Sequence, residues 1–409
     1  MKILYISYDG MTDALGRSQV IPYLLGLSTK GYTIHIISCE KKTVSKAERD
    51  YVAEILRKNK IHWHPLSFSS QPPFLSKVID VVKIKKKSLE LQQKESFNIV
   101  HCRSYIAALA GLELKRKHKV KFVFDMRGFW ADERIDGKIW NLKNPIYKII
   151  YNYFKKKEKW FFNHADSIVS LTQNGKIVIE EIFGEEIARK ATVIPCCVDT
   201  ELFSREKVSE SQIRELKQSL GLPADSFVLS YLGSVGTWYL LDEMLLFFKK
   251  LKSRFPDARF LFISGDEPSH IKRKAGETGI DPDDIIVARA SRENVPAYLS
   301  LSDASIFFIK PVFSKKASSP TKQAEIMSMG IPVICNSGVG DTDLIFAGND
   351  VGLVLKDFSE TVMERGIGEL DGLLKLDPVQ IRNKAIKLFN LDDGVEKYHS
   401  IYNTIQGKV

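Results

Sequence analysis

The feature that most constrains the fold is a regular alternation of short apolar segments with longer amphipathic ones, which runs along the chain twice. We expect strands at 2–8, 32–39, 97–102, 120–125, 166–172 and 191–195 in the first run, and at 227–233, 258–265, 284–290, 304–310, 331–336 and 351–356 in the second. Helical patterns such as 104–117 and 237–256 separate most of these strands. Because parallel strands are buried on both faces, this alternation predicts parallel sheets covered by helices.

A polar segment at 196–226 interrupts the alternation. We therefore predict an α/β protein with two doubly wound, Rossmann-like domains. The expected parts are an N-terminal domain at 1–195, a junction at 196–225, a C-terminal domain at 226–385 and closing helices at 386–409 that pack back toward the N-terminal domain. Ligands of such sheets bind beyond the carboxyl ends of the strands, so we expect an active site in a central cleft between facing domains.

Charge divides the chain into two unequal halves. Residues 1–200 contain 34 Lys and Arg against 21 Asp and Glu, a balance of +13, whereas residues 201–409 contain 26 against 29, a balance of −3. A basic half suits nucleic acid, an anionic membrane or a phosphorylated substrate. The chain has no apolar run of about 18 residues, no signal-peptide pattern and no zinc spacing among its five cysteines. These features favour a cytoplasmic protein with reduced thiols.

One predicted helix carries a lysine at its start. Ser319 is expected as the N-cap and Pro320 as the first helical residue, which places Lys322 near the third position. The helix dipole and the lysine are both positive there, so an anion is expected between them. We predict that amides at Ser319 to Thr321 hold a phosphate with Lys322, and that Glu325 accepts hydrogen bonds from a ribose. A surface Lys322–Glu325 ion pair is the alternative interpretation.

The segment 318–334, "SSPTKQAEIMSMGIPVI", resembles the donor-site segment of family 4 glycosyltransferases, which have the GT-B fold. Four further segments, 165–172, 193–203, 230–236 and 260–268, resemble other parts of that family in the same order. The resemblance implies a retaining transfer of a sugar from a UDP- or GDP-sugar, with no metal or other cofactor. It assigns ribose binding to Glu325 and favours a bacterial surface-polysaccharide or glycolipid pathway.

The sequence departs from the family pattern at two places. The family often has a second glutamate that contacts the donor sugar, but the matching position is Ala317. The usual Arg and Lys after the first strand of the nucleotide domain are also absent. Lys322 is therefore expected to balance most of the diphosphate charge and to act in catalysis. The donor-binding residues that we predict are Gly16, Arg17, Gly233, Ser234, Gly236, Thr237, Ser319, Thr321, Lys322, Glu325, Gly338, Gly340 and Asp341.

Two loops in that set also fit plain strand-to-helix turns. Gly338 and Gly340 permit close backbone approach, and Asp341 is expected to cap the next helix. In the first domain, Gly16 allows a tight turn, Arg17 is expected to pair with a phosphate, and Ser18 is a candidate N-cap.

The densest polar run of the first domain follows its fourth expected strand. Asp125 and Arg127 are candidate catalytic residues, the former stabilising positive charge on the sugar ring and the latter orienting a phosphate. The candidate acceptor-binding residues are His101, Arg103, Trp130 and Asp132. An ion-pair cluster that holds a loop is the alternative.

Lysines and apolar residues alternate at 76–94 and 144–162. Each segment fits either an amphipathic helix with a solvated face or a helix that docks on an anionic membrane. Membrane docking would suit a lipid-linked rather than a free saccharide acceptor, and would place the protein on the inner face of the cell membrane. Two other functions stay open, a GT-B nucleotide-sugar epimerase and a non-catalytic nucleic-acid-binding protein. Because no nucleic-acid-binding motif is present, we expect no nucleic-acid partner.

Overall fold

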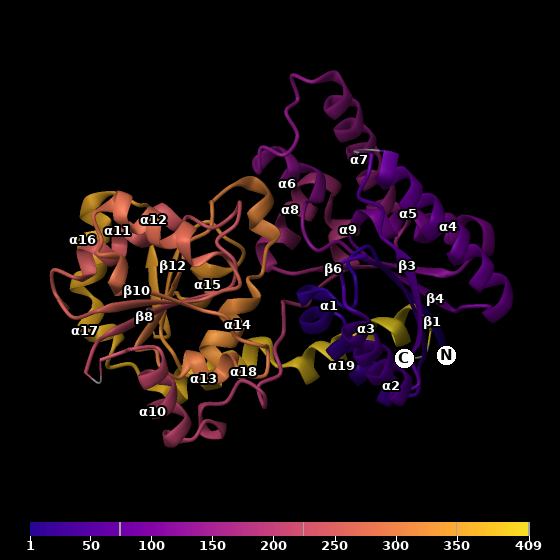
Figure 1. Cartoon of the computed structure of the whole chain (residues 1–409). Helices are drawn as coiled ribbons and strands as arrows, with labels where there is room; N and C mark the ends of the chain where they lie inside the picture. The colour runs from indigo at the N-terminus through magenta and orange to yellow at the C-terminus, as the bar shows by residue number, and fades with distance from the viewer. Residues whose placement is uncertain (73–74, 224, 349, 408–409) are drawn as a thin grey trace. The chain divides into compact units, whose positions relative to one another are not determined.

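The computed structural model describes residues 1–72, 75–223, 225–348 and 350–407. It divides into two compact units, one formed by Met1–Cys197 with Leu391–Val409 and the other by Val198–Asn390 (Figure 1). The segment expected as a junction, 196–225, lies almost wholly in the second unit, and the last helix of the chain lies in the first. The chain therefore passes from one unit to the other twice.

The first unit is built on a parallel sheet of seven strands in the order β3-β2-β1-β4-β5-β6-β7. The strands are β1 (Lys2–Ser7), β2 (Thr33–Glu40), β3 (His62–Ser67), β4 (Ile99–Arg103), β5 (Lys121–Asp125), β6 (Ser167–Ser170) and β7 (Ala191–Val193). In the register, Ile3 of β1 lies beside Ile34 of β2 and Ile99 of β4. The strand order reverses between β1 and β4, which is where doubly wound sheets bind ligands.

Helices surround this sheet. They are α1 (Ala14–Gln19), α2 (Ile21–Thr29), α3 (Lys46–Lys58), α4 (Leu75–Glu95), α5 (Ser104–His118), α6 (Trp130–Asp136), α7 (Pro145–His164), α8 (Gln173–Phe183), α9 (Glu185–Arg189) and α19 (Leu391–Ile405). The expected N-cap Ser18 is wrong: it lies inside α1, where its hydroxyl donates to the Ala14 carbonyl at 2.7 Å. A serine side chain satisfied by the preceding turn has no role as a cap.

The second unit repeats the pattern with six parallel strands in the order β10-β9-β8-β11-β12-β13. These strands are β8 (Val228–Leu232), β9 (Arg259–Ile263), β10 (Ile285–Ala288), β11 (Ala304–Phe307), β12 (Val333–Asn336) and β13 (Gly352–Leu355). The order reverses between β8 and β11. Both units are thus doubly wound and Rossmann-like, as the alternation predicts.

The described helices of the second unit include several short ones. They are η1 (Arg205–Lys207), α10 (Glu210–Ser219), α11 (Leu241–Leu251), α12 (Pro268–Thr278), η2 (Pro282–Asp284), α13 (Val295–Leu299), η3 (Phe313–Ala317), α14 (Thr321–Ser328), α15 (Thr342–Ile345), α16 (Glu360–Gly368), α17 (Leu370–Leu373) and α18 (Pro378–Phe389). The expected start of α14 is wrong by one residue. Pro320, at ψ 117°, is extended and forms the N-cap, so Lys322 is the second helical residue.

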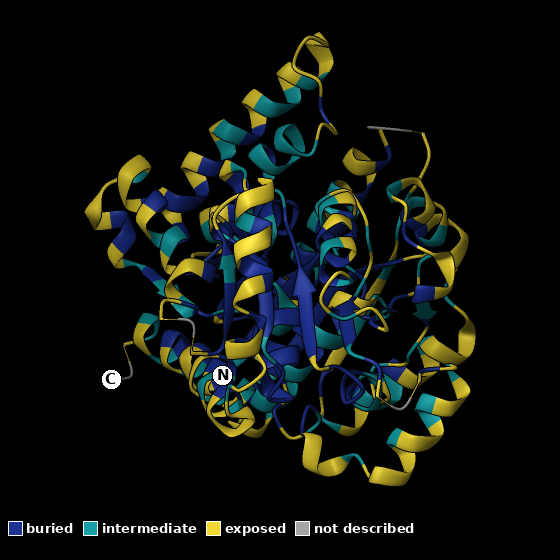
Figure 2. Ribbon diagram, turned by 90° about the vertical axis from the view of Figure 1, so that its left-hand side faces the viewer, coloured by how far each residue is buried: buried dark blue, intermediate teal, exposed yellow. Residues whose placement is uncertain are grey.

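Each unit has its own apolar core. Apart from the partly exposed edge strand β3, the strands are largely buried while the outward faces of the helices are exposed, as the dark blue strands and yellow helix surfaces of Figure 2 show. In the first unit, Val395, Tyr398, Ile401 and Tyr402 of α19 belong to the same buried cluster as Ile3 and its neighbours. The five cysteines are buried and unbonded. In the described part of the chain, no helix has the length and apolar character needed to cross a membrane.

Candidate active site

Four loops of the second unit leave the carboxyl ends of neighbouring strands. They follow β8, β9, β11 and β12, and the first and third of these strands flank the point where the sheet order reverses. The predicted donor residues Gly233, Ser234, Gly236 and Thr237 lie in the β8 loop, and Gly338, Gly340 and Asp341 lie in the β12 loop. Helix α14 begins after the β11 loop and carries Lys322 and Glu325.

Lys322 is the centre of this arrangement. Its ammonium group donates to the Tyr231 hydroxyl at 2.8 Å and lies 4.0 Å from the centroid of that ring and 3.7 Å from the Tyr239 ring. A Cβ atom placed on Gly233 would lie 3.2 Å from Lys322 Nζ, so the amine rests against the β8 loop. Gly233 has φ +104°, a conformation that favours glycine. The structure therefore brings Lys322 and Gly233 together, as the predicted phosphate site requires.

The position of Lys322 is electrostatically costly without a ligand. The side chain is 7% exposed, and burial lowers its pKa well below the usual value, opposed by the carboxylates of Glu325 and Asp266. Asp266 is itself held in the β9 loop, where it accepts from the Val235 amide at 2.5 Å and the Ser264 hydroxyl at 3.1 Å. An anion beside the amine would offset the loss of hydration that burial causes.

Glu325 faces Arg292, a residue that sequence reasoning missed. Arg292 Nη1 lies 2.8 Å from Glu325 Oε1, and its guanidinium lies 5.3 Å from the centroid of the Phe203 ring. Burial raises the pKa of Glu325, whereas Arg292 and then Lys322 lower it. The signal that could have found Arg292 is its place in the charged loop that follows β10, at the same edge of the sheet.

The 3-10 helix η3 joins two of the predicted loops. The Gly340 amide donates to the Lys315 carbonyl at 2.8 Å, and Lys315 Nζ lies 3.8 Å from the centroid of the Trp238 ring in the β8 loop. Lys315, which is buried, was also missed by sequence reasoning. Gly338 has φ +81°, and its amide donates to the Asp343 carboxylate at 2.9 Å. These contacts fix the β8 and β12 loops relative to each other.

The start of α14 differs from the expectation. The Gln323 amide donates to the Pro320 carbonyl at 3.1 Å, so helical bonding begins there and not at Ser319. Thr321 directly precedes Lys322 and Ser319 lies three residues before it, at the helix start where the dipole favours an anion. Ala317, which stands where the family often has a second glutamate, is fully buried. Asp341 occupies the N-cap position of α15, but its side chain forms no cap hydrogen bond there, so the expected cap is wrong.

The candidate catalytic residues Asp125 and Arg127 lie in the first unit. Asp125 is 1% exposed and accepts from the Tyr398 hydroxyl at 3.1 Å, while His101 Nε2 and Arg127 Nη1 lie 3.5 and 3.9 Å from its carboxylate. Burial raises the pKa of Asp125, but Arg127 and His101 together hold it below the usual value. The carboxylate is enclosed by side chains, so its catalytic role stays a prediction.

The four candidate acceptor residues have separate surroundings. His101 shares a 2.6 Å hydrogen bond with Tyr402 of α19. Arg103 is 4% exposed, and its Nε donates to Asp9 at 3.3 Å. Trp130 packs against Tyr105, Trp140 and Phe154 and lies under the Arg134 guanidinium. Asp132 accepts from Tyr151 and Lys155 at 2.8 Å each, which links α6 to α7.

The loop between β1 and α1 is held by a residue that the sequence did not indicate. The buried carboxylate of Glu40 accepts from the amides of Met11 and Thr12 at 2.8 and 3.2 Å. A Cβ atom on Gly16 would lie 2.2 Å from the Gly10 carbonyl, so this glycine permits close packing. Arg17 lies 5.5 Å from the centroid of the Tyr51 ring.

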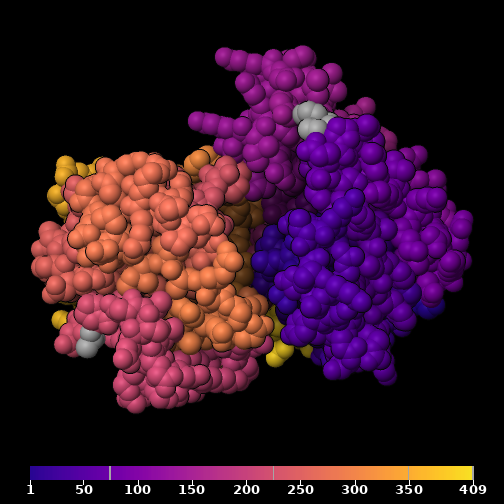
Figure 3. Space-filling model, viewed as in Figure 1, coloured from indigo at the N-terminus to yellow at the C-terminus, as the bar shows by residue number. Residues whose placement is uncertain are grey.

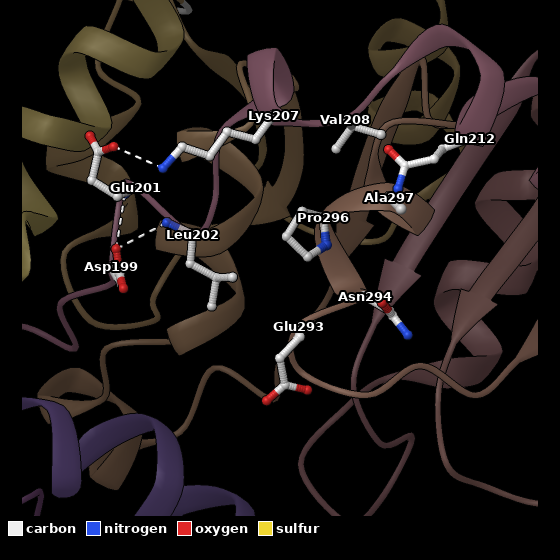
Figure 4. A pocket seen from close by; sticks show the side chains of 10 residues that line it. All are labelled: Asp199, Glu201, Leu202, Lys207, Val208, Gln212, Glu293, Asn294, Pro296 and Ala297. Carbon is white, nitrogen blue, oxygen red and sulfur yellow. Dashed lines mark hydrogen bonds and ion pairs between the residues drawn. The ribbon is translucent and has the colours of Figure 1, made fainter. Parts of the chain in front are cut away.

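A separate pocket of about 370 Å³ lies at the start of the second unit (Figure 4). Its polar groups largely satisfy one another. Lys207 pairs with Glu201 at 2.9 Å, and Asp199 accepts from the amides of Glu201 and Leu202 at 3.0 Å. With Glu293 also in its wall, the pocket is acidic and does not suit a phosphate. In the described part of the chain, no cluster of three His, Cys, Asp or Glu residues is arranged for a metal ion.

The fold and this edge of the second sheet define the class of protein. Two doubly wound parallel sheets in one chain are shared with solved GT-B structures. Sucrose-phosphate synthase of Thermosynechococcus elongatus is 14% identical, with a TM-score of 0.74 and complete coverage of both chains. A glycosyltransferase of Rickettsia africae is 16% identical, with a TM-score of 0.70 over 100% of this chain and 99% of that one. HepE of Anabaena, in complex with UDP and glucose, is 13% identical, with a TM-score of 0.70 over 99% of this chain and 100% of that one. The protein is thus an α/β protein of the GT-B class.

Sequence comparison gives the family. The family described as "Glycosyltransferase Family 4" matches residues 23–202, and "Glycosyl transferases group 1" matches residues 212–372. The chain belongs to the family 4 type of GT-B glycosyltransferases, as the resemblance implies. An uncharacterized glycosyltransferase of Methanocaldococcus jannaschii is 24% identical over 217 residues, which are 49% of this chain and 48% of that protein. The match thus spans about half the length of this curated relative.

Proposed function

We propose that the protein transfers a sugar from a nucleotide diphosphate sugar to an acceptor, with retention of configuration and without a metal. The observation that carries the proposal is the buried Lys322 amine against the Gly233 loop, at the carboxyl edge of the second sheet. This arrangement places a buried lysine amine where doubly wound sheets bind nucleotides. The solved HepE complexes, which contain UDP or UDP-glucose, make a uridine nucleotide the first to test, before a guanosine nucleotide.

In this proposal the residues of the second unit have separate roles. Lys322 neutralises charge that develops on the departing diphosphate, and the amides of the Gly233 loop donate hydrogen bonds to it. Glu325 accepts from the ribose hydroxyls, and Arg292 favours the ionised form of its carboxylate and orients it. Since Ala317 offers no polar group, the loop at Gly338–Asp341 is the proposed contact for the donor sugar. The setting that we propose is bacterial polysaccharide or glycolipid synthesis at the inner membrane surface.

The ribose role of Glu325 can be measured directly. Glu325→Ala removes a buried charged acceptor, so we expect nucleotide affinity to fall by about 1–3 kcal/mol in isothermal titration with UDP and GDP. Glu369→Ala, an exposed glutamate of the same unit, is the matched control and should leave the affinity unchanged. Equal affinity of the Glu325 variant and the native protein would refute the ribose role.

Product analysis separates transfer from epimerisation. With a labelled donor and a saccharide or lipid-linked acceptor, transfer yields a labelled acceptor and one nucleotide diphosphate for each sugar moved. Recovery of an epimerised donor, with no labelled acceptor, would contradict the proposed reaction and leave the nucleotide site intact.

A further inference from the structure

The first unit contains an apolar groove that the proposed transfer reaction does not yet use. Its volume is about 670 Å³, which lies within the range of small-molecule pockets. Helices α4, α5, α6 and α7 all contribute to it. The walls include Val78 and Val81 of α4 and Ile150 of α7, and the buried side chains Ile106 and Leu109 lie on α5. Figure 3 shows the segment that leads into the start of α7, in purple to magenta, standing out from the rest of the first unit.

The walls of the groove are fixed by a buried carboxylate. Asp80 of α4 is fully buried and accepts from the Tyr8 hydroxyl at 3.2 Å, from the Ser69 amide at 3.0 Å and from Lys83 at 3.1 Å. These bonds hold the first half of α4 against Tyr8, the residue that follows β1. The groove thus begins beside the carboxyl end of β1, next to the reversal of strand order in the first sheet.

Two cations lie at this end of the groove. Lys77 lines it and has its ammonium 5.7 Å from the centroid of the Tyr8 ring, while Arg134 lies 4.9 Å above the ring of Trp130, another lining residue. Within residues 1–72 and 75–197, neither cation has an ion-pair partner. Partial loss of hydration and then the charge of Arg134 lower the pKa of Lys77, so the two cations repel each other. A bound anion would relieve that repulsion.

We propose that this groove binds the hydrocarbon chain of a lipid-linked acceptor, with the phosphate or diphosphate head group between Lys77 and Arg134. The inference rests on the proposed function, because it names the class of acceptor for the transfer reaction. The concave shape of the groove favours a single hydrocarbon chain over a bilayer. A flat bilayer surface would not reach the buried side chains of Ile106 and Leu109. The placement of both cations at one end matches a molecule that is charged at one end.

The test uses farnesyl diphosphate, a soluble isoprenoid with a diphosphate head, and isothermal titration. We expect the native chain to bind it, and Val81→Trp to weaken binding about tenfold, because filling the groove displaces about two methylene groups of the chain. Val82→Trp is the matched control, since Val82 is adjacent on α4, exposed and outside the groove; it should change affinity less than twofold. Repeating the titration in Lys322→Met excludes binding at the donor site.

The contact between the diphosphate head group and Arg134 is tested by comparing farnesyl diphosphate with farnesol. Arg134→Gln should weaken farnesyl diphosphate more than tenfold but leave farnesol, which has no charge, unaffected. Lys86→Gln is the control for a lost cation, because Lys86 is nine residues from Lys77 and so faces the opposite side of α4.

Three results would overturn the inference. They are no binding of farnesyl diphosphate by the native chain, equal effects of Val81→Trp and Val82→Trp, or sedimentation with phosphatidylglycerol vesicles that Val82→Asp abolishes and Val81→Trp does not. The last would assign the surface to a bilayer. Titration of the same preparations with UDP and GDP measures nucleotide binding separately. Nucleotide binding without farnesyl diphosphate binding would overturn the groove proposal and leave the proposed donor site supported.

Discussion

The amine of Lys322 is subject to two opposing effects. Two tyrosine ring faces at 3.7 and 4.0 Å favour the ammonium form, whereas burial favours the neutral amine and dominates. A diphosphate beside the amine adds a strong attraction to the charged form. The pKa of Lys322 should therefore rise when a nucleotide binds.

This rise predicts proton uptake on binding. At a pH between the lowered pKa of the free protein and the ordinary lysine pKa of about 10.4, the amine gains up to about one proton per nucleotide. Because binding takes up a proton, the affinity for the nucleotide increases as the pH falls through that range. Isothermal titration with UDP in buffers of different ionisation enthalpy measures the uptake. Lys322→Met should abolish it, and Lys387→Met, an exposed lysine of the same unit, should not. Uptake that persists in Lys322→Met would assign the proton to another group.

Site residues could be predicted from the sequence where they belong to a recognisable motif. Lys322 and Glu325 could be identified because they occupy one helix face in a recognisable segment. Arg292 and Glu40 occur singly in loops or at a strand end, and their partners are distant in sequence. Only the fold brings such pairs together, so spacing along the chain gives no indication of them.

Strand burial decides which elements the sequence reveals. The uniformly apolar strands of both sheets were predicted, but β3 was not, because it contains Pro65 and two histidines. It pairs with β2 alone at the edge of the sheet, where a proline is tolerated and burial is partial. Helix α6 was likewise expected as a polar loop, since its seven residues are too few to show a helical period.

Helix α5 lies close to the sheet of the first unit at Gly111. A Cβ atom there would lie 2.4 Å from Cys102 Sγ in β4 and 2.9 Å from Phe122 in β5. We expect Gly111→Ala to lower the free energy of unfolding by about 1–2 kcal/mol, since overpacking outweighs the gain in helix propensity. Gly276→Ala in α12 is the matched control, because its Cβ would meet no atom within 4 Å. Chemical denaturation should show this control unchanged or stabilised by up to about 1 kcal/mol; a destabilised control and an unaffected Gly111 variant would contradict the packing argument.

At the scale of the whole molecule, the last helix stabilises the unit in which the chain begins. Helix α19 buries Val395, Tyr398, Ile401 and Tyr402 in the first core. Each such side chain is worth about 1.5–3 kcal/mol, so truncation after Asn390 should remove most of the stability of the first unit and little from the second.

Calorimetry of the truncated chain checks this expectation. Tryptophan fluorescence adds a local measurement, because Trp238 is the single tryptophan between residues 198 and 390 and the other four precede residue 198. Truncation after Gln406 is the control and should leave unfolding unchanged. A chain truncated after Asn390 that unfolds like the full-length protein would show that α19 is dispensable.

The double passage of the chain between the units has a consequence for synthesis on the ribosome. Residues 198–390 form a unit from one continuous segment, whereas the first unit lacks α19 until residues 391–405 have been translated. The second unit, although later in sequence, is therefore the first to have all of its chain. Until α19 has been translated, the nascent first unit exposes the apolar surface that α19 will cover, and this exposure makes it prone to aggregation.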